Sequence, residues 1–130
     1  RNAESAVRTF RADYVQRTMA GIKALNVTVA RIDQPALREQ CAECLDDYAL
    51  FHLTIIMINY LFNPNAPWNH SERKKQYRRT LNLPIFRMPL RRYHGGRFPL
   101  TRQAALFSMK WHLYCASAAI AWVRHRQFGD

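Results

Sequence analysis

The sequence AALFSMKWHLYCASAAIAWV, residues 104–123, carries one formal charge, that of Lys110. A helix of this length rises about 30 Å, which matches the thickness of the hydrocarbon core of a bilayer. Arginines flank the segment on both sides, and Trp122 occupies the interfacial position that tryptophan favours in membrane helices. The segment therefore predicts a long helix, over about residues 102–127, that crosses a membrane.

Lys110 keeps a second interpretation open for this segment. A charge deep in a bilayer costs about 2.5–3.5 kcal/mol on insertion scales, so the alternative is a helix buried inside a helical protein. Small residues recur at four-residue spacing in its second half, which lets two helix backbones approach closely. The small residues expected to pack against a neighbouring helix are Cys115, Ser117, Ala119 and Ala121.

A second apolar segment, residues 48–62, carries no charge at all. Its fifteen residues fall short of the roughly twenty that a membrane crossing needs, so a half-buried helix and a second crossing both remain open. Pro35 suits the first turn of a helix, where a missing N–H costs little. The Asn-Pro-Asn-Ala-Pro run at residues 63–67 stops it. These signals predict a second helix over residues 35–62.

The N-terminal part of the chain has the pattern of an amphipathic helix. Phe10 and Tyr14 belong to a series of apolar residues at three- and four-residue steps. Asn2 can accept a hydrogen bond as the N-cap of this helix. We therefore expect a first helix over residues 3–31, and a helical hairpin formed by residues 1–62.

A strongly basic region, residues 63–101, separates the hairpin from the C-terminal apolar segment. Residues 70–103 contain ten lysines and arginines and one acidic residue, Glu72. The whole chain has a net charge of +11, so most of its positive charge lies in this segment. Three prolines and a Gly-Gly pair in its second half break regular structure. Apart from a short helix over about residues 71–81, capped by Ser71, an irregular arm is expected.

So much positive charge needs phosphates, anionic lipid headgroups or an acidic protein surface nearby. Aromatic side chains alternate with the arginines, a combination that suits RNA phosphates and unstacked bases. Clusters of basic residues are also typical of sites that bind anionic lipids such as cardiolipin. The candidate partner-binding or lipid-binding residues are Arg73, Lys74, Lys75, Arg78, Arg79, Arg87, Arg91, Arg92, Arg97 and Arg102.

Two weaker signals for metal or haem chemistry are present. Cys41 and Cys44 form a lone CxxC pair, but a zinc site would need two further ligands. His52 and His112 lie in the two most apolar segments, and haem ligation would require both rings to face one cavity. Two small core residues and two packed core histidines are the simpler interpretations. No phosphate-binding glycine loop or catalytic triad stands out, so we expect no enzyme activity, cofactor, metal or small-molecule substrate.

The sequence as a whole predicts a single all-α subunit, residues 1–130, with three main helices. The last of these belongs to a C-terminal membrane-spanning part, residues 102–130, which follows the irregular basic arm. The chain starts at Arg1, and a start of this kind fits removal of an arginine-rich mitochondrial presequence.

In composition the chain resembles the supernumerary subunits of mitochondrial oxidative-phosphorylation complexes, which are short and basic with one or two apolar helices. The resemblance implies a non-catalytic accessory subunit of a respiratory complex or ATP synthase in the mitochondrial inner membrane. Its membrane helix and basic arm would hold neighbouring protein subunits and anionic lipid together. The alternative is a mitochondrial ribosomal protein that binds rRNA through residues 70–102.

Overall fold

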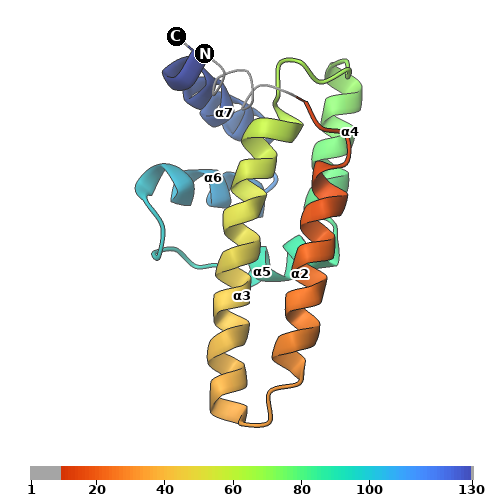
Figure 1. Ribbon diagram of the computed structural model, residues 1–130. Helices are drawn as coiled ribbons and strands as arrows, with labels where there is room; N and C mark the ends of the chain where they lie inside the picture. Colours follow the sequence, from red (N-terminus) through yellow and green to blue (C-terminus); the bar gives the residue numbers. More distant parts are fainter. Residues whose placement is uncertain (1–9, 130) are drawn as a thin grey trace.

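The computed structural model describes residues 10–129, and all regular structure in this range is helical (Figure 1). The predicted all-α class is confirmed, but the prediction of three main helices is wrong. The described range contains six α-helices and one π-helix. In chain order these are α2 (Tyr14–Ala30), α3 (Pro35–Ile56), η1 (Met57–Leu61), α4 (His70–Leu81), α5 (Pro84–Arg92), α6 (Leu100–Lys110) and α7 (Tyr114–Gly129).

Helices α2 and α3 form the antiparallel hairpin expected from the first half of the chain (Figure 1). Pro35 is in the first turn of α3, as predicted, where no N–H partner is needed. Residues 10–13 are not helical, so α2 begins later than expected, and the predicted Asn2 cap lies outside the described residues. Ile22 is the one buried residue of α2, and the far end of the hairpin therefore projects away from the core.

Helix α3 continues into the short π-helix η1. The Phe62 N–H donates to the Met57 carbonyl at 3.0 Å, one residue further back than in an α-helix. Arg73 of α4 then donates to the carbonyls of Leu61 at 2.6 Å and Asn63 at 3.2 Å. The helix thus ends where the Asn-Pro segment predicts, and an arginine from the basic region satisfies the carbonyl of its last residue and that of Asn63 just beyond it.

The segment expected to be an irregular arm, residues 63–101, is mostly helical. Helix α4 agrees within one residue with the short helix predicted there. Its cap is Asn69 and not Ser71, because the Asn69 side chain accepts a hydrogen bond from the Glu72 N–H at 2.8 Å. The described part of this segment is therefore ordered by its own secondary structure.

Helix α5 forms although it contains two prolines, residues that disfavour a helix. Pro84 occupies its first turn, where proline is favoured, and only Pro89 removes an internal hydrogen bond. Phe86, Pro89 and Leu90 are buried, which places them at the three- and four-residue spacing of one helix face. Burial of that face, which packs on α3, offsets the lost hydrogen bond.

The long C-terminal helix predicted over residues 102–127 is divided into α6 and α7 by a corner at residues 111–113. His112 has a left-handed backbone with φ of 54°, which a continuous helix cannot contain. The Leu113 N–H donates to the Ser108 carbonyl at 2.7 Å and closes the corner. Within the described residues, no helix combines the length and the apolar character required to cross a bilayer.

The core lies where the second half of α3 meets η1 and the shorter helices α4 to α7. A buried chain of hydroxyl groups links three of these helices: Tyr77 Oη is 2.8 Å from Ser117 Oγ, which is 2.7 Å from Ser108 Oγ. Large side chains fill the remaining volume. Those that are fully buried include Leu50, Leu53, Ile56, Met57, Leu61, Leu81, Phe86, Tyr93, Leu106 and Met109.

Candidate functional site

Part of the predicted basic set holds the chain's own helices together. Arg92 makes two hydrogen bonds to the Asp46 carboxylate, at 2.6 and 2.8 Å, and so ties α5 to α3. Arg97 contacts Asp47 of α3 at 3.0 Å. Arg73, at the end of η1, likewise contacts its own chain. These three arginines were predicted to bind partners, and the structure places them in contacts within the molecule.

Arg102 also contacts its own chain. Its guanidinium carbon lies 4.4 Å from the centre of the Phe51 ring on α3, a cation–π geometry. Burial, and secondarily the positive charge of Arg124, lower the pKa of Arg102. Arg102 therefore packs the start of α6 against α3.

Lys110 has backbone carbonyls as partners. Its ammonium group donates to the Tyr93 carbonyl and, at 3.5 Å, to the Arg91 carbonyl. These carbonyls lie at the C-terminal end of α5, where the helix dipole favours a cation. The charge that disturbed the predicted membrane segment thus holds α6 to the end of α5.

The remaining predicted basic residues lie on the outside of α4 and α5. They are Lys74, Lys75, Arg78, Arg79, Arg87 and Arg91. The Lys74 ammonium lies 5.6 Å from the centre of the Tyr114 ring. Within the described residues, the side chains of the other five form no ion pair and no hydrogen bond. These side chains are available to a partner.

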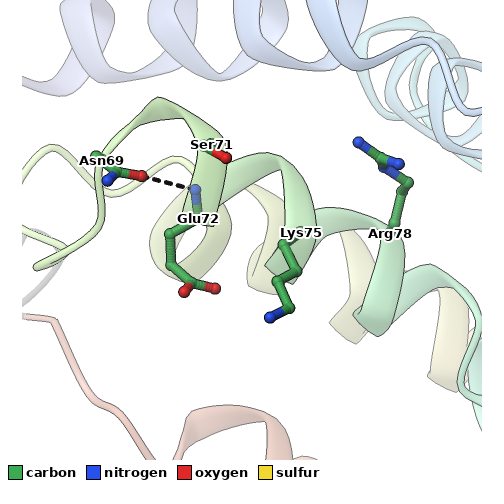
Figure 2. A pocket seen from close by; sticks show the side chains of 5 residues that line it. All are labelled: Asn69, Ser71, Glu72, Lys75 and Arg78. Carbon is green, nitrogen blue, oxygen red and sulfur yellow. Dashed lines mark hydrogen bonds between the residues drawn. The ribbon is translucent and has the colours of Figure 1, made fainter.

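The outer side of α4 carries a shallow hollow of about 420 Å³, whose lining residues are drawn in Figure 2. Lys75 and Glu72 point to one side of the helix, and Arg78 points to the other. Glu72 also accepts a hydrogen bond from Gln76 at 3.2 Å. The acidic Glu72 makes this hollow a mixed surface and a poor site for a compact anion.

A second hollow, of about 390 Å³, lies between the end of α4, helix α5 and the α6–α7 corner. We call it the basic groove. Arg87, Arg91 and Lys110 supply three positive charges, Trp111 supplies an aromatic ring, and none of the described residues that line the groove is acidic. The lining residues are Leu81, Asn82, Arg87, Leu90, Arg91, Lys110, Trp111 and His112.

Trp111 is the most distinctive residue of the basic groove. It is 65% exposed, although large aromatic side chains usually bury most of their surface. The left-handed backbone of His112 ends α6 directly after Trp111 and turns the chain into α7. A left-handed conformation is strained for most residues other than glycine. Strain of this kind is frequent at functional sites, and here it coincides with a cationic groove.

The four small residues predicted to pack against another helix divide between two faces of α7. Ser117 and Ala121 are fully buried against the rest of the chain. Cys115 and Ala119 are exposed on the opposite face. This outer face also bears Trp122, Val123 and Arg126, which are spaced to align with Cys115 and Ala119, and the Arg126 guanidinium covers the Trp122 ring at 4.9 Å.

The residues considered for metal or haem binding are separated. Cys41 is half-buried and Cys44 is exposed, so Cys44 is not the core residue of the simpler interpretation, and neither forms a disulfide. His52 packs on Tyr48 with a ring separation of 4.4 Å, whereas His112 lines the basic groove. In the described part of the chain, no three His, Cys, Asp or Glu residues are grouped so as to hold a metal ion.

Sequence reasoning found Arg87 and Arg91 but missed the other half of the basic groove. Lys110, Trp111 and His112 belonged to the predicted membrane segment, and no spacing rule connects them with α5. The one available signal was the pair of polar residues Lys110 and His112, which stand on either side of Trp111 within an apolar run.

Comparison with protein-family models, curated proteins and solved structures gives no match to this chain.

Proposed function

We propose that the protein is a non-catalytic structural component of a ribonucleoprotein, the mitochondrial ribosome, and that its basic surface binds RNA. The observation that carries this proposal is the basic groove, where Arg87 and Arg91 lie beside exposed Trp111 and their side chains pair with no other described residue. Arginine guanidinium groups bind phosphates, and exposed aromatic rings stack on unpaired bases. The same combination is found where proteins bind single-stranded regions of folded RNA.

The charge balance around the basic groove supports a polyanionic partner. Residues 70–112 contain eleven lysines and arginines and one acidic residue, Glu72. Five of these basic residues make internal contacts, namely Arg73, Arg92, Arg97, Arg102 and Lys110. The other six lie on the outside of α4 and α5. A surface of this kind attracts the phosphate backbone of RNA without regard to sequence.

The first prediction concerns the affinity of the purified full chain for RNA. The affinity for a fluorescein-labelled 20-nucleotide RNA should fall as salt increases, by a log–log slope of about −0.7 for each phosphate contacted. The double variant Arg87→Gln/Arg91→Gln should reduce the magnitude of that slope by about 1.4. Fluorescence anisotropy measured from low to physiological salt gives both values.

The matched control is Lys23→Gln/Arg31→Gln, which removes the same charge from the exposed end of the hairpin. Its slope should equal that of the unchanged protein. An equal loss in both double variants would show that only net charge matters, and absence of RNA binding at low salt would contradict the proposed function.

A second candidate is the accessory subunit of a respiratory complex or ATP synthase in the mitochondrial inner membrane. The observation that favours it is the outer face of α7, where Trp122 and Val123 are 59% and 45% exposed. A neighbouring protein subunit could cover this face, while the basic surface contacts anionic lipid. Sedimentation of detergent-solubilised mitochondria distinguishes the two candidates, since the chain should migrate either with ribosomes or with an oxidative-phosphorylation complex.

A further inference from the structure

We propose that the basic groove holds one unstacked base of single-stranded RNA on Trp111, with the neighbouring phosphates on Arg87 and Arg91. This proposal rests on the proposed RNA-binding function and assigns the groove a specific ligand. The volume of about 390 Å³ lies within the range of about 300–1,000 Å³ that is usual for small-ligand pockets. A single nucleotide is a ligand of that class.

The first step is that the backbone at Trp111 is held in a fixed position. The backbone N–H of Trp111 donates to the Phe107 carbonyl at 3.1 Å, and the backbone N–H groups of the next two residues donate to the carbonyls of Met109 and Ser108. The Lys110 ammonium lies 5.8 Å from the centre of the Trp111 ring and is itself bonded to the end of α5. Because the backbone that carries the ring is already ordered, only the side-chain torsions of Trp111 lose freedom when a base stacks on the ring.

The second step concerns the two arginines. Arg87 and Arg91 are four residues apart on α5, so their side chains emerge from the same face of the helix. Phe86 and Leu90 each precede one of these arginines and lie about 100° around the helix from it. Both are buried, which fixes the orientation of the arginine face. Both arginines therefore line the same groove as Trp111, where they can contact the phosphates next to a base stacked on the ring.

The third step concerns the end of α5, whose carbonyls would repel a phosphate through the negative end of the helix dipole. Lys110 donates to the carbonyls of Tyr93 and Arg91 and offsets this negative charge. Lys110 is thus a positioning residue, which holds Trp111 and makes the end of α5 acceptable to an anion.

A single strand fits this arrangement better than a duplex or a lipid headgroup. A duplex keeps its bases stacked and offers mainly phosphates and 2′-hydroxyls to a protein. An anionic lipid supplies phosphate without a base, and the face of Trp111 would have no stacking partner. Of these three ligands, only an unpaired nucleotide uses both the arginines and the ring.

The second prediction tests this assignment with the full chain and three variants, Trp111→Ala, Trp111→Phe and Trp122→Phe. Trp111→Ala should weaken binding of a single-stranded 12-nucleotide RNA by roughly tenfold, the lower part of the range for loss of one stacked base. Trp111→Phe should lose less, because a smaller ring remains. Trp122→Phe, the matched control on α7, should bind as the unchanged chain does.

Duplex RNA of the same length and vesicles containing cardiolipin complete the experiment. Trp111→Ala should leave duplex binding unchanged, and the single strand should quench tryptophan fluorescence in Trp122→Phe but much less in Trp111→Phe. Salt-dependent RNA binding that Trp111→Ala does not alter would overturn the groove assignment and leave the proposed function standing. Absence of RNA binding, with vesicle binding that Trp111→Ala weakens, would overturn both.

Discussion

Among single residues, Ser117 is expected to have a large influence on stability for its size. Its hydroxyl lies between those of Tyr77 and Ser108, and all three side chains are at most 4% exposed. Burial raises the pKa of Tyr77, which keeps its hydroxyl protonated. The Ser108 hydroxyl also donates to the Ala105 carbonyl at 2.7 Å. The chain of hydroxyls therefore joins α4, α6 and α7 through groups that have no access to water.

The third prediction is that Ser117→Ala lowers the free energy of unfolding by about 1–3 kcal/mol, because it leaves the buried Tyr77 hydroxyl without this partner. Tyr77→Phe should cost less, since Ser117 keeps its contact with Ser108. Urea denaturation of both single variants and of the double variant measures these effects.

The double variant provides the control for this prediction. If the cost of Ser117→Ala comes from an unpaired hydroxyl on Tyr77, removal of that hydroxyl as well should recover part of the loss. The double variant should then be more stable than the sum of the two single changes implies. Strictly additive losses would contradict a direct interaction between the two side chains.

At the scale of elements, the corner between α6 and α7 is where sequence and structure disagree most. A continuous helix and a helix broken at His112 respond in opposite ways to glycine and alanine. In a continuous helix, glycine at this position would cost about 1 kcal/mol relative to alanine. At a left-handed position glycine carries no steric penalty, whereas alanine is disfavoured by about 1–2 kcal/mol.

The fourth prediction follows from the φ of 54° at His112. His112→Gly should be more stable than His112→Ala by about 1 kcal/mol. Thermal unfolding of the two variants, followed by circular dichroism at 222 nm, measures the difference. A more stable alanine variant would indicate that α6 and α7 form one helix in solution. Both variants remove the imidazole, so its loss does not affect the comparison.

For the whole molecule, the features that could be predicted from sequence are those set by local signals. Pro35 marks the start of α3, the Asn-Pro run marks the end of η1, and the charge pattern marks α4. The features that could not be predicted depend on tertiary contacts. Helix α5 forms in spite of Pro89 because its buried face packs on α3, and no residue between 104 and 123 is a proline or glycine that would indicate the corner.

The candidate site was predictable only in part for the same reason. The outward arginines were visible as a dense basic region, but sequence does not show which of them are paired inside the fold. Arg91, Arg92 and Arg97 are close together in the sequence. Arg92 and Arg97 form ion pairs because Asp46 and Asp47 of α3 lie opposite them, whereas Arg91 forms none with the described residues. Such pairing depends on how α3 packs against α5.

The same division between local and tertiary stabilisation gives the fifth prediction. The hairpin end, residues 23–44, has no buried residue and packs mainly through contacts between α2 and α3, whereas residues 49–61 include much of the core. Local opening of the hairpin end should therefore cost much less than global unfolding. Hydrogen exchange followed by mass spectrometry should show amides of residues 39–44 exchanging on the order of a hundredfold faster than those of residues 50–61. Residues 39–44 lie beyond the first turn of α3, whose N–H groups have no acceptor within the helix, so both segments have helical hydrogen bonds and differ in tertiary packing. Equal protection would show that the hairpin end is stabilised by something beyond the contacts of the described chain, such as a second copy covering Val27 and Leu37.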